Sequence, residues 1–210
     1  MMSSFSKTLL APFREVKNII GSLVIGWPCT PFGNRMREKF YRKRLRSLGN
    51  NPVIEPGVLF GQPDTIDIGN ECIFGRNVNV NAGECHGIYI GSNIALAEGT
   101  YVRSGNHKFN DLALPILKQG HTAKKIEYAG KIYSVVIEND VWVGAHCIIL
   151  SGAMIGTGSV IGAGARVSGE IPPYSIVVGN PGKIIGNRLE KYGPKKTMEK
   201  VGIGEKSIDE

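Results

Sequence analysis

Histidine is the residue type in this chain best suited to proton transfer near neutral pH, because an imidazole titrates at about 6.5. The four histidines are His86, His107, His121 and His146. His107 ends the hexad Val-Arg-Ser-Gly-Asn-His and opens a long excursion, roughly residues 105–134, between two regular segments. Long excursions from a regular array are usually functional. A histidine at this point could act as a general base.

The segments on either side of the excursion carry a six-residue repeat. Its 14 key positions are all apolar, which a composition of 42% hydrophobic residues would rarely give by chance. Glycine follows seven of them, where a sharp corner would need positive φ or close backbone approach. A second set, four residues further on, is mostly small or slim, as at Cys72, Thr100 and Ala153. The 14 positions are Ile54, Phe60, Ile68, Phe74, Val80, Ile90, Leu96, Val102, Ile137, Val143, Ile149, Ile155, Ile161 and Val167.

This repeat predicts short strands joined by tight turns, with one aliphatic side chain pointing inward on each side. Three sides make a triangular coil of about 18 residues, and stacked coils pair their backbones with the coils above and below. The sequence therefore predicts an all-β fold, a parallel β-helix of about five coils over residues 53–178. An α/β fold is disfavoured because no helical segments separate the strands.

The N-terminal region differs in charge from the rest of the chain. Residues 1–46 hold ten Lys and Arg against two acidic residues, whereas residues 47–210 hold 15 basic and 16 acidic residues. A basic arm favours an anionic partner surface, although it could be only a solvated helix. Apolar residues at helical spacing, including Phe40 and Tyr41, predict a helix that caps the first coil. Residues 18–34 carry no charge and could lie on a bilayer surface or pack on the same end of the coil.

Three parts of the chain follow from these patterns. They are a basic helical arm or cap over residues 1–48, the β-helix over 49–185 with its excursion at 105–134, and a C-terminal tail over 186–210. No uncharged apolar run reaches 18 residues, which argues against a membrane-spanning helix. The four cysteines show no zinc or disulfide spacing, and no signal peptide is expected. A cytoplasmic protein, with the arm at the inner face of the membrane, is the favoured location.

Residues 140–185, DVWVGAHCIILSGAMIGTGSVIGAGARVSGEIPPYSIVVGNPGKII, carry a specific resemblance. Their V-W-V-G and G-N-P-G-K motifs, after a histidine that opens a long loop, resemble the hexapeptide-repeat acyltransferases. The similar branch is that of the sugar O-acetyltransferases acting on maltose, galactosides, nodulation factors, colanic acid and O-antigen. The resemblance covers about 160 residues from Gly49. It implies a left-handed β-helix, a homotrimer with acyl-CoA between subunits, and an acetyl-CoA-dependent acyltransferase that needs no metal.

By the same resemblance, His107 is the catalytic base and Trp142 lies beside the donor groove or the acceptor. Asn106 and Glu98 could orient His107 or bind the sugar, and Asn81 and Glu84 could do so more weakly. The residues implied to bind acetyl-CoA are Gly144, Ala145, Gly162, Ala163, Ser168, Lys183 and Arg188. The chain departs from the family at Ser168-Gly169-Glu170, where a lysine is usual, and at Lys108, where many relatives have proline.

The expected reaction is direct acetyl transfer to a saccharide hydroxyl, in the synthesis of a cell-surface polysaccharide such as O-antigen, capsule or exopolysaccharide. The acceptor could be a free sugar, a nucleotide sugar or a lipid-linked oligosaccharide, and no nucleic acid is expected as a partner. N-acetylation of an amino sugar is the main alternative. A non-catalytic scaffold at a membrane is another. A metal-dependent hydratase resembling γ-carbonic anhydrase is disfavoured, because His107, His121 and His146 lack two closely spaced ligands.

Overall fold

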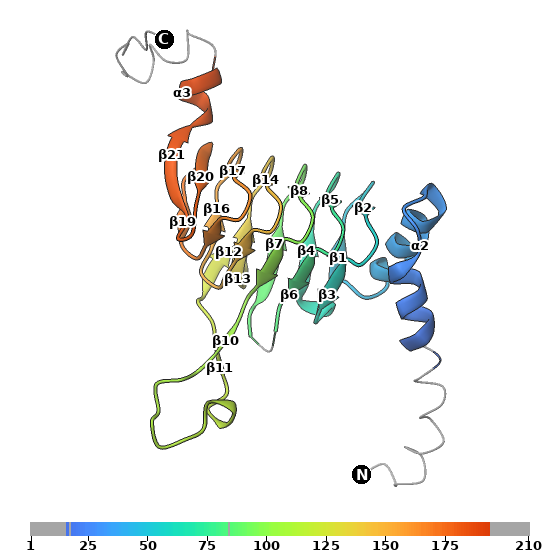
Figure 1. Ribbon diagram of the computed structural model, residues 1–210, viewed down its shortest axis with the longest axis horizontal. Coiled ribbons are helices and arrows are strands. Elements are labelled where there is room, and N and C mark those ends of the chain that lie inside the picture. The colour runs from blue at the N-terminus through green and yellow to red at the C-terminus, as the bar shows by residue number, and fades with distance from the viewer. Residues whose placement is uncertain (1–15, 17, 84, 194–210) are drawn as a thin grey trace.

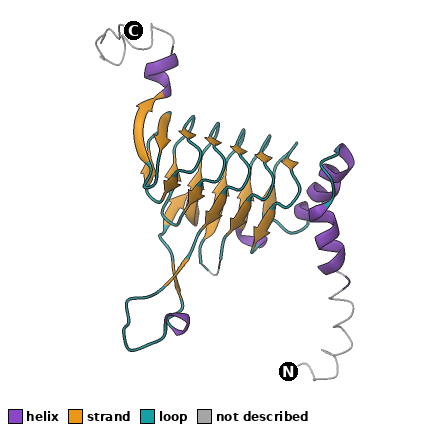
Figure 2. Ribbon diagram, viewed as in Figure 1, coloured by secondary structure: helices purple, strands orange, loops and turns teal. Residues whose placement is uncertain are grey.

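The computed structural model describes residues 16, 18–83 and 85–193, and three parallel sheets form the faces of a prism (Figures 1 and 2). The first sheet contains β1 (Ser47–Leu48), β4 (Ile66–Ile68), β7 (Gly87–Ile90), β13 (Lys131–Ile137), β16 (Met154–Ile155) and β19 (Glu170–Ile171). The second contains β2 (Val53–Ile54), β5 (Ile73–Phe74), β8 (Ala95–Leu96), β14 (Trp142–Val143), β17 (Val160–Ile161) and β20 (Ser175–Val178). The third contains β3 (Leu59–Gly61), β6 (Asn79–Asn81), β9 (Tyr101–Arg103), β15 (Ile148–Ile149) and β18 (Arg166–Val167).

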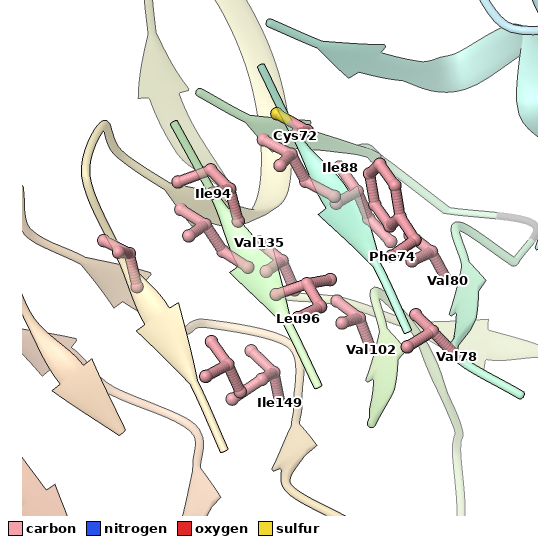
Figure 3. Packing of buried hydrophobic residues seen from close by; sticks show 14 of the residues in the cluster. Cys72, Phe74, Val78, Val80, Ile88, Ile94, Leu96, Val102, Val135 and Ile149 are labelled. Atoms are coloured by element: carbon pink, nitrogen blue, oxygen red, sulfur yellow. The ribbon is translucent and has the colours of Figure 1, made fainter. Parts of the chain in front are cut away.

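The chain visits the three sheets in turn, so each round is one coil of a parallel β-helix. The described residues make five complete coils and two sides of a sixth, which confirms the predicted fold. The first strand, β1, lies a few residues before the predicted start of the coils. All 14 repeat positions are buried, and the small or slim residues four positions later are buried with them, whereas Asp64 and Asn106 are exposed. Figure 3 shows how Phe74, Leu96, Val102 and Ile149 meet inside the prism.

The glycines that follow the inward aliphatics permit close approach between coils rather than positive φ. None of the seven is among the described residues with positive φ; for six of the seven, the residue with positive φ lies two positions later, as at Asn77 and His146. A Cβ on Gly75 would lie 2.8 Å from the backbone nitrogen of Glu98 in the next coil. Real Cβ atoms do not approach so closely, so these positions need glycine because neighbouring backbones touch there.

Helix α2 (Pro31–Arg42) lies at the N-terminal end of the prism (Figure 1). Some backbone groups of the first coil, including the carbonyls of Ile54 and Val58, face this end and have no earlier coil to pair with. Arg37 Nε donates to Ile54 O at 2.5 Å, and the Tyr41 hydroxyl donates to Val58 O at 2.7 Å. Burial raises the pKa of Tyr41 to about 12. The helix thus provides the hydrogen bonds that an exposed sheet edge would otherwise lack.

Arg37 lies one turn before Tyr41 on the inner face of α2, and its side chain is 1% exposed. It is buried because its guanidinium reaches two backbone carbonyls, those of Ile54 and, at 2.6 Å, Trp27. Phe40, expected to face the coil, is half-buried.

A buried polar cluster joins the residues after α2 to the strand that ends the excursion. Asp67 on β4 accepts hydrogen bonds from Arg46, Tyr133 and Ser47. Burial alone would raise the pKa of Asp67, but these hydrogen bonds outweigh it and hold the pKa well below its usual range. The cluster therefore ties the N-terminal cap, the second coil and β13 together.

The excursion leaves the prism after β9 and returns through β13. It contains β10 (Asn106–His107), the 3-10 helix η2 (Ile116–Lys118), β11 (His121–Thr122) and β12 (Ile126–Tyr128). Strand β12 pairs antiparallel with β13, while β10 and β11 form a separate two-stranded ribbon that projects away from the prism (Figure 1). At the C-terminal end, β21 (Lys183–Asn187) pairs antiparallel with β20 and leads into the short helix α3 (Arg188–Tyr192).

Candidate functional site

His107 lies at the base of the ribbon, just outside the corner between the third and first sheets. Its side chain is exposed, as the sequence predicts for an outward position. The corner below it is rigid: the buried Ser104 hydroxyl donates to Ala82 O in the preceding coil, and Gly105 is buried. The imidazole thus stands on a fixed base but faces solvent, where an acceptor could reach it.

His121 lies directly opposite His107 across the ribbon. The two ring centroids are 4.5 Å apart, with an angle of 39° between the ring planes. The sequence does not predict this contact, because the six-residue repeat gives no register inside the excursion. The available signal is the pair of His residues in the excursion, one near its start and one near its middle, at a spacing that an antiparallel ribbon can bring together.

The other predicted acceptor residues separate into different places. Asn106 precedes His107 on β10, so its side chain leaves the opposite face of the ribbon. Asn81 ends β6 at the same corner of the prism, and its Oδ1 accepts from Gly83 N at 2.9 Å. Glu98 lies at another corner, between β8 and β9, where its carbonyl accepts from His146 N. Within one chain Glu98 therefore does not orient His107. Glu84 lies outside the described residues.

Trp142 projects from the second sheet and is 57% exposed. It lines an open groove of about 510 Å³ together with Asn93, Ala95, Asp140, Val141, Val160, Arg188 and Tyr192. Arg188 Nη1 donates to Gly158 O at 2.5 Å and lies 3.3 Å from an oxygen of Asp140. The structure thus brings together two predicted donor-binding residues, Trp142 and Arg188, on one face of the prism.

The small residues predicted to flank the donor lie at the corner between the second and third sheets. Gly144 and Ala145 follow β14, and Gly162 and Ala163 follow β17 one coil further on. A Cβ on Gly144 would lie 2.6 Å from Ala163 N, so the two turns stack in contact. The exposed surface at this corner carries no large side chain from these four residues. A slim ligand could therefore lie along it.

The two remaining predicted donor residues lie in different places: Ser168 is at another corner, whereas Lys183 pairs with Val178, whose side chain lies 2.9 Å from where a Cβ on Gly162 would be. Ser168 is exposed after β18, at the corner between the third and first sheets. Lys183 is exposed at the start of β21, opposite Val178. Within the part of the chain that the structure describes, neither forms a hydrogen bond or ion pair with Trp142 or Arg188.

His107 and the donor-side residues lie on different sides of one chain. In a triangular prism, the face of the second sheet, with Trp142, is opposite the corner between the other two sheets, where His107 lies. Figure 1 shows β14 on the side of the prism away from β10 and β11. Within one chain, the residue predicted to be the base and the residues predicted to bind the donor are therefore apart.

The described residues do not gather metal ligands. Among residues 16, 18–83 and 85–193, no three His, Cys, Asp or Glu side chains are arranged to hold a metal ion. His146 has a φ of 57° and lies at the corner between the second and third sheets, away from His107 and His121. The three histidines of the hydratase alternative are therefore not brought together within one chain.

Known proteins share both the repeat and the fold. Residues 134–169 match the bacterial transferase hexapeptide family (six repeats). Galactoside O-acetyltransferase of Escherichia coli K12 is 31% identical over 151 residues, which cover 71% of this chain and 67% of that protein. The chain therefore belongs to the hexapeptide-repeat acyltransferases, and its relatives include the sugar O-acetyltransferase branch.

Two solved structures show the same fold at lower identity. The hexapeptide-repeat acetyltransferase VCA0836 of Vibrio cholerae, complexed with acetyl coenzyme A, has a TM-score of 0.63 and 23% identity and covers 89% of this chain and 90% of that one. The N-acyltransferase AntD of Bacillus cereus, in complex with dTDP and 3-hydroxybutyryl-CoA, has a TM-score of 0.53 and 21% identity. It covers 80% of this chain and 97% of that one.

Proposed function

We propose that this chain transfers an acetyl group from acetyl-CoA to a saccharide hydroxyl, with His107 as the general base. The observation that carries the proposal is the exposed imidazole at the base of the excursion, in a β-helix of the hexapeptide-repeat family. The name of the E. coli relative supports a sugar acceptor, and the ligand of the V. cholerae structure supports acetyl-CoA as the donor.

The chemistry requires a base because a sugar hydroxyl is a poor nucleophile at neutral pH. The His107 imidazole takes the hydroxyl proton as the oxygen attacks the thioester carbon. A backbone N–H stabilises the negative charge on the carbonyl oxygen. The intermediate then collapses, the carbon–sulfur bond breaks, and the imidazolium returns its proton to the leaving thiolate of CoA. No enzyme-bound acetyl group is formed.

The donor would lie along the corner of small residues. Pantetheine is a slim chain, and Gly144, Ala145, Gly162 and Ala163 leave room for it beside the backbone. Trp142 offers a flat apolar surface at the adjacent face. Lys183 and Arg188 could meet the CoA phosphates, and Ser168 could donate a hydrogen bond.

We propose that the active unit is a homotrimer in which His107 of one subunit faces the donor corner of the next. The separation of His107 from Trp142 in one chain supports this arrangement. The excursion supports it further, because Phe109, Leu112 and Leu117 are 72%, 98% and 84% exposed. Apolar side chains this exposed are typical of a surface that meets another protein.

The shared site can be tested by subunit complementation. His107→Ala removes the base, and Ala145→Trp fills the donor corner, so each variant alone should be inactive. When the two are co-expressed, random assembly should restore about a quarter of the wild-type sites, because such sites join one intact half from each variant. Mixed trimers without activity would mean that the site lies within one subunit.

The base is tested by the kinetics of His107→Ala with the full chain. We expect kcat to fall by roughly 10²–10⁴-fold, with little change in acetyl-CoA affinity. Glu127→Ala, which trims an exposed side chain on β12, is the control and should leave turnover unchanged. Near-normal turnover in His107→Ala would reject the assignment.

N-acylation of an amino sugar is a second candidate, favoured by the fold shared with AntD. The same base can serve an amine or a hydroxyl. A screen with labelled acetyl-CoA should pair each hydroxyl sugar with its amino counterpart, as free sugar, nucleotide sugar and lipid-linked oligosaccharide. O-acetylation predicts a labelled product that is released by mild base, whereas an amide product would resist it.

We propose that the enzyme works at the inner face of the membrane in cell-surface polysaccharide synthesis. Residues 18–26 form a helix whose inner side contacts the first coil, through the buried Val24 and a hydrogen bond from Gly57 N to Ile25 O. Its outer side exposes Ile19, Ile20 and Leu23. No helix among the described residues is long and apolar enough to cross a bilayer. This outward apolar stripe is suited to lying in a lipid interface.

Charge on α2 supports the same placement. Arg35 and Lys39 follow the exposed Phe32 by three and seven residues, so all three share the outer side of the helix. In the described part of residues 16–46, the one acidic side chain, Glu38, is paired with Arg42 at 2.7 Å. An apolar stripe beside unpaired basic residues favours a bilayer with anionic headgroups.

Vesicle co-sedimentation tests this placement. Ile20→Ser/Leu23→Ser should reduce binding to vesicles that contain phosphatidylglycerol, and Arg35→Glu/Lys39→Glu should reduce it mainly at low salt. Ile132→Ser, exposed on β13, is the matched apolar control and should bind normally. Equal partitioning of all variants would contradict the membrane role. If wild-type trimers associate in pairs and Ile20→Ser/Leu23→Ser abolishes this association, the stripe is instead an interface with a second copy of the protein.

A further inference from the structure

The contact between His107 and His121 follows from the register of the ribbon. Lys108 N donates to Gly120 O at 3.0 Å, so residues 108 and 120 form a hydrogen-bonded pair. The next pair, His107 and His121, is then a non-hydrogen-bonded pair, in which side chains leave the same face at the closest spacing of an antiparallel ladder. The ring separation of 4.5 Å lies at the short end of the range for aromatic pairs.

His107 needs a support of this kind because its strand is short. The ribbon consists of two residues on each side and projects away from the prism. A general base must be held close to its productive orientation, and a displacement of about 1 Å can cost about 10²-fold in rate. The prism fixes the Cα of His107, but the ring can still turn about its side-chain bonds. His121 is the less exposed of the two histidines and lies against that ring.

We infer that His121 is a positioning residue, whose ring packs against one face of the His107 imidazole and sets the orientation of the base. The inference rests on the proposed role of His107. Contact between the rings carries the effect, so the property required at position 121 is a flat side chain.

Three variants of the full chain separate this role from others. His121→Ala should lower kcat roughly 10-fold, with an unchanged KM for acetyl-CoA. His121→Phe should retain most of the wild-type kcat, because it keeps a flat ring at the same place. Thr122→Ala removes the neighbouring side chain from the opposite face of β11 and controls for loosening of the ribbon.

The outcomes are distinct. Wild-type kcat in His121→Ala, or a loss in Thr122→Ala equal to that in His121→Ala, would overturn the positioning role. A loss in His121→Phe as large as in His121→Ala would also overturn it, and would show that a nitrogen of His121 is required. Failure of the proposed function gives a different result, since His107→Ala would then turn over normally. An unchanged thermal midpoint in each variant establishes that the prism is intact.

Discussion

The prism and the excursion use their apolar residues in opposite ways. Inside the prism, Ile137 and Ile149 are fully buried, and each coil pairs its backbone with the next. In the excursion, Leu112 is 98% exposed, and the ribbon pairs two residues with two. Within the prism each coil is covered by its neighbours, whereas the excursion leaves large apolar side chains exposed.

This difference explains where function can lie. A stacked coil holds its corners rigidly, because a shift of one coil would break contacts with both neighbours. Segments that leave the repeat are free to vary, and they carry side chains such as His107 out to solvent. In the proposed function, the prism therefore fixes the donor corner and the base of the ribbon, and the excursion carries the proposed general base.

The largest expected effect separates the two regions by stability. Ile137→Ala should lower the free energy of unfolding by about 2–5 kcal/mol, because it leaves a cavity between coils. Leu112→Ala should change it little in the isolated subunit, since its side chain contacts solvent. Chemical denaturation at a protein concentration that favours monomers measures both. Equal losses would mean that the excursion is part of the folded core.

The second prediction concerns the end of the prism, where regular pairing stops. Arg37→Ala should destabilise the chain by about 1–3 kcal/mol, because the carbonyls of Ile54 and Trp27 lose their donor. Arg35→Ala is the matched control, since this arginine is exposed on the same helix. Thermal unfolding should separate the two variants. Similar midpoints would show that water replaces Arg37 at the end of the first coil.

The sequence predicts the prism well because the repeat is a local signal. Each of the 14 positions is selected by its own place in the period, and each is buried. The position of Glu98 can also be predicted from the six-residue period. One full side of the coil, which contains Val102, lies between Glu98 and His107, so the two residues are at different corners of the prism. The reason for glycine after the inward aliphatic residues is harder to predict. It depends on how one coil stacks on the next, which the sequence of a single turn does not show.

Side chains outside the repeat were predicted less well, for physical reasons. Arg37 is buried because two carbonyls at the end of the first coil require a donor, and helical periodicity alone does not contain that requirement. His121 meets His107 because of the ribbon register, which no period in the excursion sets. The donor half of the site could be named only through family resemblance, since slim residues at a corner have no chemistry of their own.

The smallest expected effect is a pH dependence in the cluster that joins prism, cap and excursion. Asp67 has a lowered pKa in the folded chain, so its ionised form contributes stability above its unfolded value of about 3.9. That contribution is lost as the pH falls toward the folded pKa. The free energy of unfolding of Asp67→Asn should therefore be lower than that of the wild type near pH 7, and the difference between the two should decrease below about pH 4. Denaturation curves across this range provide the measurement, with the exposed Asp111→Asn as control. If the difference in unfolding free energy did not change with pH, the charge of Asp67 would not contribute to stability. The cap and the excursion would then be joined by packing alone.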